Sequence, residues 1–208
     1  MIVNIVAGSP FDLELLNMHP SDITIGVDYG AIRLLNMGIA LDYAFGDFDS
    51  ISLEDLNRLE KICKNINKYK IEKNNTDTEL AFEFVLTLKP KVINLFGVTG
   101  KRLDHFLSTL FLFERIKNTE CELYIYDEHN KIYLKKPGTY NIKKSTYKYI
   151  SFFMYDKPVT LALKNFKYGL DNYLLKNQDS LCISNEITGD YGIISFTGGH
   201  LLIVESKD

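Results

Sequence analysis

Apolar residues follow two different spacings along the first two-thirds of the chain. Short continuous runs, rich in β-branched and aromatic residues, predict buried strands over residues 2–6, 23–27, 43–45, 66–71 and 92–96. Between these runs, apolar residues recur three and four positions apart, which predicts helices over residues 31–35, 53–62, 80–88 and 103–113. Repeated strand–helix units predict a mostly parallel, Rossmann-like sheet with helices on both faces.

The pattern changes near Lys135-Lys136-Pro137-Gly138, after which we predict only strands, over residues 147–155, 159–163, 181–183, 192–196 and 201–205. Gly198-Gly199 predicts a hairpin turn between the last two, because both residues can adopt positive φ. We therefore predict an α/β domain over residues 1–136 and an antiparallel β domain over residues 137–208. A domain of about 70 residues buries too little surface to be stable alone, so we expect it to pack on the first domain or on a second copy of the chain.

Aspartates follow the predicted strands of the first domain. Asp28, Asp47 and Asp49 come directly after two of these strands, and Asp77 and Asp104 follow two more after short loops. Because ligands of an open parallel sheet bind beyond the carboxyl ends of its strands, we expect these carboxylates to share one rim. Helix capping is the competing explanation for each of them taken singly.

Capping explains some of these residues better than others. For Asp28 alone it is the better interpretation, and Thr76-Asp77-Thr78-Glu79 matches a capping box that leaves Asp77 available as a ligand. Within Gly46-Asp47-Phe48-Asp49-Ser50, Ser50 and the following Ser52 already suit the capping position. Two like charges about 4 Å apart repel by roughly 4 kcal/mol at an effective dielectric near 20, which a divalent cation would offset. We therefore favour a metal site at Asp47 and Asp49.

The segment Gly97-Val98-Thr99-Gly100-Lys101-Arg102-Leu103-Asp104-His105 is a second candidate site. Two glycines after a strand allow close backbone approach to an anion at a helix N-terminus, and Arg102 can bind a phosphate through two hydrogen bonds. The spacing matches neither a Walker A loop nor GxGxxG. The equally weighted alternative is a plain strand–helix turn in which Arg102 pairs with Asp104 on the surface. His105 alone is more typical of a partly buried structural imidazole than of a catalyst.

Composition narrows the classes of function. The hydrophobic content of 46% and charged content of 25% are those of an ordinary globular protein, and a net charge of −3 gives no case for a nucleic-acid or anionic-membrane partner. The three cysteines, Cys63, Cys121 and Cys182, form no CxxC or Cys/His pattern, so a zinc site is not expected. Together with the lack of a signal-peptide pattern, the cysteine count predicts a reducing cytoplasm. No apolar run is long enough to span a bilayer.

Taken together, these segments resemble the thiamine pyrophosphokinase family over most of the chain. The first two that carry the resemblance are Asp28-Tyr29-Gly30-Ala31 and Gly46-Asp47-Phe48-Asp49-Ser50. The others are Thr76-Asp77-Thr78-Glu79-Leu80-Ala81, the Gly97–His105 segment, and Ser184-Asn185-Glu186. Each is weak singly, but their order and spacing together are specific.

The resemblance implies an ATP-binding α/β domain, a thiamine-binding β-sandwich and a homodimer with active sites at its interface. It implies transfer of the pyrophosphoryl group of ATP to the thiamine hydroxyl, with release of AMP and with Mg²⁺ as cofactor. By position, Asp47, Asp49 and Asp77 would be the metal ligands. Catalytic roles would fall to these three aspartates and Asp104. The expected ATP contacts are Asp28, Gly30, Thr76, Gly97, Gly100, Arg102, Asp104 and His105.

Ser184 and Asn185 would contact the thiamine pyrimidine. The chain departs from many relatives at Lys101, where they have glycine, and at Thr109, where they have asparagine, so we expect altered nucleotide contacts with activity retained. Tryptophan, which stacks on thiamine in some relatives, is absent here, and we expect Tyr173 to replace it. The aspartate arrangement also suits another Mg²⁺-dependent transferase, such as a pterin pyrophosphokinase or a nucleotide-sugar transferase. A non-catalytic thiamine or nucleotide sensor is the remaining alternative.

Overall fold

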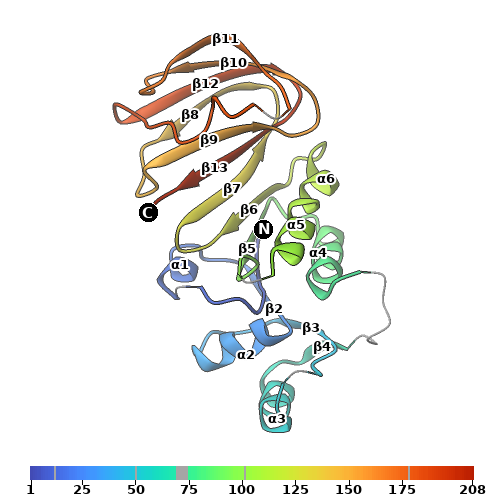
Figure 1. Cartoon of the computed structure of the whole chain (residues 1–208). Helices are drawn as coiled ribbons and strands as arrows, with labels where there is room; N and C mark the ends of the chain where they lie inside the picture. Colours follow the sequence, from blue (N-terminus) through green and yellow to red (C-terminus); the bar gives the residue numbers. More distant parts are fainter. Residues whose placement is uncertain (12, 50, 69–74, 101, 178) are drawn as a thin grey trace. The chain divides into compact units, whose positions relative to one another are not determined.

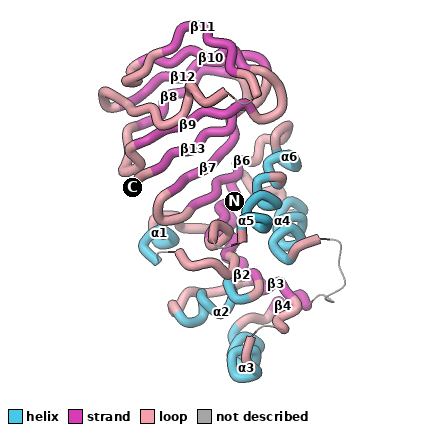
Figure 2. Tube along the Cα trace, viewed as in Figure 1, coloured by secondary structure: helices cyan, strands magenta, loops and turns pink. Residues whose placement is uncertain are grey.

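The computed structural model describes residues 1–11, 13–49, 51–68, 75–100, 102–177 and 179–208. The chain divides into two compact units, Met1–Glu128 and His129–Asp208 (Figure 1). Helices belong to the first unit, and the described part of the second contains strands and loops (Figure 2). No helix in these described ranges is long and apolar enough to cross a membrane.

The first unit is built on a parallel sheet with the strand order β4-β3-β2-β1-β5-β6. Its strands are β1 (Ile2–Val6), β2 (Ile23–Val27), β3 (Tyr43–Gly46), β4 (Asn65–Lys68), β5 (Val92–Phe96) and β6 (Glu122–Tyr126). The predicted parallel sheet is thus confirmed, and the predicted strand bounds agree closely. The fourth strand was predicted to continue to residue 71, but residues 69–71 lie outside the described part of the chain.

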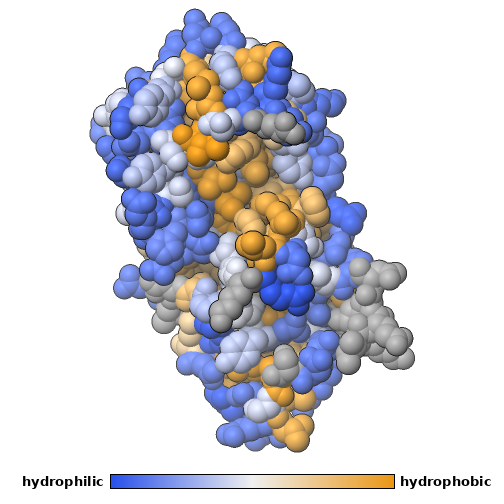
Figure 3. All heavy atoms as spheres, viewed as in Figure 1, coloured by the Kyte–Doolittle hydropathy of each residue, from blue (hydrophilic) through white to orange (hydrophobic). Residues whose placement is uncertain are grey.

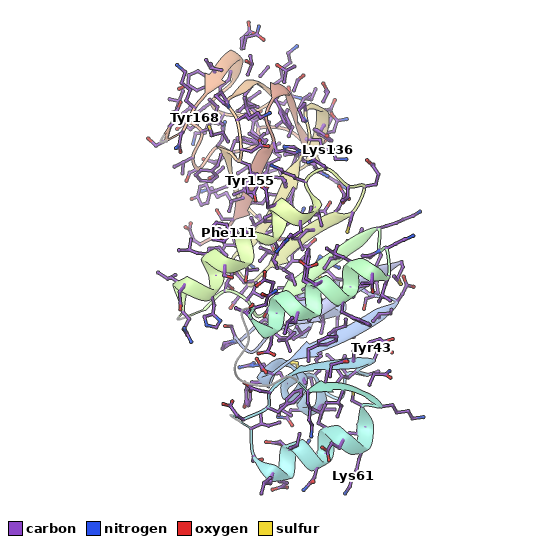
Figure 4. The ribbon with its side chains drawn as sticks, turned by 90° about the vertical axis from the view of Figure 1, so that its right-hand side faces the viewer. Tyr43, Lys61, Phe111, Lys136, Tyr155 and Tyr168 are labelled. Atoms are coloured by element: carbon purple, nitrogen blue, oxygen red, sulfur yellow. The ribbon has the colours of Figure 1, made fainter. Side chains whose placement is uncertain are left out.

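Helices cover both faces of this sheet, as predicted. The helices are α1 (Leu13–Asn17), α2 (Tyr29–Asn36), α3 (Leu53–Ile62), α4 (Asp77–Thr87), α5 (Leu103–Leu110) and α6 (Leu112–Ile116). Tyr43 and Phe45 place their ring centroids 4.9 and 5.2 Å from that of Phe84 in α4 (Tyr43 is labelled in Figure 4). Ala44, between them, packs in a buried cluster with Leu34 of α2 and other residues of α2 and α3. Because successive strand residues point to opposite faces, α4 lies on one face and α2 with α3 on the other.

The second unit is a β-sandwich of antiparallel strands. One layer has the order β7-β13-β9, from Asn130–Lys135, Leu201–Ser206 and Tyr149–Met154. The other has the order β11-β10-β12-β8, from Leu170–Leu175, Val159–Lys164, Tyr191–Gly198 and Gly138–Lys143. Buried residues alternate along β10 and β13, which gives each strand one face toward the core.

Two predictions for this unit are wrong. Residues 181–183 form a turn and not a strand. Gly198-Gly199 does not close a hairpin, because β12 pairs with β10 and β8 while β13 pairs with β7 and β9. A Cβ atom at Gly198 would overlap the carbonyl oxygen of Pro158, and one at Gly199 would overlap that of Lys157. These glycines therefore permit close backbone approach where the chain crosses from one sheet to the other.

Candidate functional site

A cavity of about 460 Å³ opens at the carboxyl ends of β1, β2 and β5. Its volume is in the usual range of small-molecule sites. All of its lining residues belong to the first unit. They are Ala7, Gly8, Ser9, Pro10, Val27, Asp28, Tyr29, Thr76, Thr78, Gly97, Val98, Arg102, His105 and Thr109. The cavity therefore lies where sequence reasoning expected ligands of a parallel sheet to bind.

The floor of the cavity is formed by the backbone just beyond β1 and β5. Ala7 N–H donates to the Phe96 carbonyl at 2.8 Å, and Ser9 N–H donates to the Gly97 carbonyl at 2.9 Å. These bonds extend the pairing of the two strands past their ends. Gly97 has φ +66°, and a Cβ atom there would overlap the carbonyl oxygen of Ala7. Glycine is therefore required at this position both by its dihedral angle and by space.

Asp28 reaches the cavity in a strained conformation. It occupies the position before α2, but its side chain makes no capping hydrogen bond, so the capping interpretation is wrong for this residue. Its φ of 48° and ψ of −124° are costly for a residue with a side chain. Its Oδ1 atom is buried, and a Cβ atom at Gly46 would overlap it. Strain of this kind, held by close packing at a cavity wall, is typical of functional sites.

Thr76 places the start of α4 at the cavity. Its Oγ1 accepts a hydrogen bond from Glu79 N–H at 3.2 Å, which confirms it as the helix cap. The Glu79 carboxylate lies 3.6 Å from Arg115 of α6 and so also links the two helices. Asp77, the first residue of α4, is half-buried and does not line the cavity.

Asp47 and Asp49 flank the buried ring of Phe48, which has φ 58°. The N–H of Asp49 donates to Oδ1 of Asp47 at 3.1 Å, so the Asp47 carboxylate helps to hold the backbone of this loop. Neither residue lines the cavity. Adjacent strands lie about 4.8 Å apart, and β3 is two strands removed from β1, which accounts for the offset. Across the described ranges, no three His, Cys, Asp or Glu side chains are grouped closely enough to hold a metal ion.

Arg102 and Asp104 form a bidentate ion pair at the start of α5. Nη2 of Arg102 lies 2.6 Å from Oδ2 of Asp104, and Nε lies 3.2 Å from Oδ1. Both side chains are exposed, and Arg102 also lines the cavity. Hydrogen bonding to Arg102 lowers the pKa of Asp104 to about 2, and the same contact raises the pKa of Arg102. The predicted surface pair between Arg102 and Asp104 is therefore confirmed, and it lies at the edge of the cavity. Phosphate binding by Arg102 stays a prediction.

We expect the Asp104 carboxyl group to stay ionised down to a pH of about 2. Because the pKa of Asp104 is lower in the folded chain, its ionised carboxylate stabilises the fold at any pH above the ordinary pKa of aspartate. This stabilisation is lost as the pH falls through the pKa of the folded state. Replacing Arg102 with leucine should return the pKa to near 4, the ordinary value of an aspartate. Side-chain ¹³C NMR titration of the wild-type chain and Arg102→Leu measures both values. An unchanged Asp104 titration in the variant would contradict the assignment of the shift to Arg102.

The structure brings only part of the predicted nucleotide set to the cavity. Asp28, Thr76, Gly97, Arg102 and His105 line it. The remaining predicted members, Gly30, Gly100 and Asp104, lie outside the lining. A Cβ atom at Gly30 would overlap the carbonyl oxygen of Val6, which gives this glycine a packing role between β1 and α2.

Sequence reasoning missed the loop over residues 7–10, together with Tyr29 and Thr78, as lining residues. Thr109, where altered nucleotide contacts are expected, does line the cavity. The turn residues Gly8-Ser9-Pro10 directly after the first predicted strand were the available signal for the loop. Thr109 is buried and donates from Oγ1 to the His105 carbonyl at 2.9 Å. Its burial could not be read from the sequence, where its neighbours Leu107 and Phe111 are apolar but exposed.

In the second unit, Asn185 is buried and its amide is engaged with the backbone. Its Oδ1 accepts hydrogen bonds from Tyr168 N–H at 3.0 Å and Glu186 N–H at 2.9 Å, and its Nδ2 donates to the Tyr168 carbonyl at 2.8 Å. Ser184 beside it is exposed, with φ 57°, and its N–H donates to Oγ of Ser151. Asn185 therefore holds the backbone of Tyr168 in place through hydrogen bonds to both its N–H and its carbonyl group.

Two tyrosines of this unit differ in what their side chains contact. The hydroxyl of Tyr173 donates to Oδ2 of Asp179 at 2.5 Å, and this bond raises the pKa of Tyr173. Tyr168 is 60% exposed and lies at the surface of the unit (labelled in Figure 4). Nζ of Lys167 lies 5.7 Å from the Tyr168 ring centroid. The same atom lies 2.7 Å from Oε1 of Glu186, which neutralises the charge of Lys167. Tyr168 is thus an exposed aromatic ring on a fixed backbone.

Two family models match the chain, and between them they cover most of it. The model described as thiamin pyrophosphokinase, catalytic domain, matches residues 16–125. The model described as thiamin pyrophosphokinase, vitamin B1 binding domain, matches residues 139–201. A relative named thiamine pyrophosphokinase, from Bacillus subtilis (strain 168), is 39% identical over 211 residues, which cover 99% of each chain.

Solved structures agree with these matches. The crystal structure of thiamine pyrophosphokinase from Bacillus subtilis has a TM-score of 0.92 at 36% identity and covers 100% of both chains. A thiamin pyrophosphokinase family protein from Enterococcus faecalis has a TM-score of 0.88 at 29% identity, again over 100% of both. The yeast enzyme of the same name, at 14% identity and a TM-score of 0.79, shares the fold.

Proposed function

Because this chain belongs to the thiamine pyrophosphokinase family, we infer that it transfers the pyrophosphoryl group of ATP to thiamine, giving thiamine diphosphate and AMP. The full-length match to the Bacillus subtilis enzyme is the observation that carries this conclusion. The cavity at the strand ends of the first unit, with Arg102, Asp28 and two backbone glycines in its wall, supports it. In the reaction, the thiamine hydroxyl oxygen bonds to the β-phosphorus, and the bridge between the α- and β-phosphates breaks to release AMP.

Mg²⁺ is proposed as the cofactor, held by Asp47, Asp49 and Asp77 with Asp28 nearby. Carboxylate oxygens are the ligands that Mg²⁺ prefers, and these residues follow β2, β3 and β4 on one edge of the sheet. When bound, the ion supplies neutralisation of phosphate charge. The donor chemistry of this set fits the ion, although the side chains are not grouped as ligands among the described residues.

The chain's own residues position the substrates and move one proton. Arg102 would exchange its exposed partner Asp104 for phosphate oxygens, which bind a guanidinium in the same two-pronged geometry. Gly97 allows the backbone to approach the phosphates closely, and Gly30, Gly100, Thr76 and His105 complete the proposed nucleotide contacts. The hydroxyl proton of thiamine would pass to a carboxylate, either Asp77 or Asp104.

We propose that the two domains, residues 1–136 and 137–208, bind ATP and thiamine respectively. Ser184 and Asn185 are the proposed pyrimidine contacts, and the buried amide of Asn185 also acts as a positioning residue for Tyr168. A homodimer with active sites at its interface is proposed as well. It is supported by the exposed apolar side chains Leu103, Leu107 and Phe111, four residues apart along and just beyond α5. Figure 3 shows hydrophobic residues (orange) at the surface among the hydrophilic ones. We also propose that the protein is located in the cytoplasm, as the cysteine count predicts.

One incubation tests the reaction. Purified protein with thiamine, ATP and Mg²⁺ should form thiamine diphosphate and AMP in equal amounts, separated by chromatography. Formation of ADP would contradict pyrophosphoryl transfer. Product from a pterin alcohol but none from thiamine would favour a related pyrophosphokinase, and thiamine binding without AMP release would favour a sensor.

Thiamine stacking distinguishes two candidate tyrosines. The thiazolium ring is a cation, and a cation over an aromatic face contributes up to about 2 kcal/mol when desolvated. We expect Tyr168→Ala to raise KM for thiamine about tenfold, because the Tyr168 ring is exposed and its backbone is held by the side chain of Asn185, a proposed pyrimidine contact. Steady-state kinetics at saturating ATP measures this change. Tyr173→Ala is the matched variant. A larger increase in KM for thiamine in Tyr173→Ala would show that Tyr173, the residue predicted from the sequence, stacks on thiamine.

A further inference from the structure

Tyr29 is an exposed aromatic residue in the wall of the cavity. It is the first residue of α2, directly after the strained Asp28, and 46% of it is accessible to solvent. The α2 residues that face the core are Gly30, Ala31, Ile32 and Leu34, so Tyr29 is not needed to fill it. Its ring is available to a ligand in the cavity.

Arg33, one helical turn later, fixes the surroundings of this ring. Its Nε donates to the Gly8 carbonyl at 3.2 Å, and its guanidinium carbon lies 5.7 Å from the Tyr29 ring centroid. A Cβ atom at Gly8 would lie 3.4 Å from that of Tyr29, so the loop passes close to the base of the Tyr29 side chain. Arg33 therefore ties the loop after β1 to the first turn of α2, and Gly8 and Tyr29 both line the cavity.

We propose that Tyr29 is the surface on which the purine base of the nucleotide stacks, with Arg33 as its positioning residue. The inference rests on the proposed function, which makes ATP a substrate. A flat heterocycle could also be a ring of thiamine, but the thiazolium is positively charged and Arg33 would repel it. The neutral pyrimidine of thiamine has its proposed contacts, Ser184 and Asn185, in the second unit. Adenine is neutral, and every base offers a π-face to an aromatic side chain.

A single fluorophore tests the contact directly. The chain has no tryptophan, so Tyr29→Trp would carry the only indole. We expect ATP and AMP to quench its emission saturably, while inorganic tripolyphosphate and thiamine leave it unchanged. Tyr191→Trp is the matched control, because Tyr191 has the same 46% exposure and does not line the cavity; its emission should not respond to ATP. Equal quenching by tripolyphosphate, or quenching by thiamine alone, would overturn the inference.

Binding measurements separate failure of this inference from failure of the proposed function. Calorimetry should give about tenfold weaker ATP binding for Tyr29→Ala and near-wild-type binding for Tyr29→Phe, since base stacking is usually lost on truncation to alanine. Tripolyphosphate affinity should be the same in all three proteins. If the wild-type chain binds ATP and Tyr29→Ala binds it equally well, the stacking role is wrong and the proposed function stands. If the wild-type chain binds no ATP, both fall.

Arg33 has its own test. Arg33→Gln retains a hydrogen-bond donor for the Gly8 carbonyl but loses the cation over the Tyr29 ring. We expect the ratio of ATP to tripolyphosphate affinity to fall about threefold, with tripolyphosphate affinity preserved, because a surface cation–π contact contributes about 0.5–1 kcal/mol. Equal weakening of both ligands would indicate a purely structural role for Arg33 and would contradict its role in positioning the base.

Discussion

Asp49→Ala is expected to lower turnover by about 100-fold or more while leaving the fold intact, because removing a group that stabilises transferring charge typically costs this much. Asp49 is exposed, and its backbone N–H donates a hydrogen bond to Asp47 that alanine retains. Surface substitutions of this kind usually change stability by less than about 0.5 kcal/mol. Mg²⁺-dependent AMP release measures the loss, and thermal unfolding measures the stability.

Glu54→Ala is the control for this prediction. Glu54 is an exposed acid in the first turn of α3, close to Asp49 in the sequence, and the change removes the same charge. We expect its activity to stay within about twofold of wild type. Partial recovery of Asp49→Ala at high Mg²⁺ would further support a ligand role. Near-wild-type turnover in Asp49→Ala would show that the metal assignment is wrong.

Gly97→Ala is expected to destabilise the chain by about 3 kcal/mol, from left-handed strain of about 1 kcal/mol and overpacking of about 2 kcal/mol. The residue has φ +66°, and its new Cβ atom would overlap the Ala7 carbonyl oxygen and press on that of Ser9. Both are backbone atoms and cannot rotate away. The displaced loop over residues 7–10 also lines the cavity, so we expect weaker ATP binding as well.

Gly38→Ala separates the two contributions. Gly38 has φ +69°, almost the same as Gly97, but a Cβ atom there would meet nothing within 4 Å. The Gly38→Ala variant should therefore be less stable than the wild-type chain by only about 1 kcal/mol. Urea denaturation of both variants gives the difference, which measures the cost of the collision. Equal losses would mean that the loop after β1 yields freely and that Gly97 is needed only for its dihedral angle.

The sequence predicted the elements of the first unit well because their signals are local. Continuous apolar runs mark β1, β2, β3 and β5, and periodic runs mark the long helices. The same rule failed for β8 and β11, edge strands of the sandwich in which only one residue each, Ile142 and Leu175, is buried. An edge strand needs few apolar residues, so periodicity gives little sign of it.

Among the site residues too, roles set by a local motif could be predicted, and roles set by tertiary packing could not. That Thr76 caps α4 followed from a local motif, and a local hydrogen bond confirms it. That Asp28 does not cap α2 could not be predicted, because its unusual dihedral angles and the close approach of its side chain to Gly46 of the neighbouring strand are features of the tertiary structure. The role of Tyr29 in the cavity wall depends equally on Gly8, which is distant in sequence.

By itself, the sequence determined the order of strands and helices, the placing of acids at strand ends, and the family. Tertiary structure decided which strand ends meet. Because β1 pairs with both β2 and β5, the loop after β1 lies between Asp28 and Gly97 and forms the cavity there, away from Asp47 and Asp49 in the loop after β3. It also put β12 and β13 in different sheets despite the glycines between them. Strand neighbours are chosen by pairing and burial between distant segments, and no local pattern of residues encodes that choice.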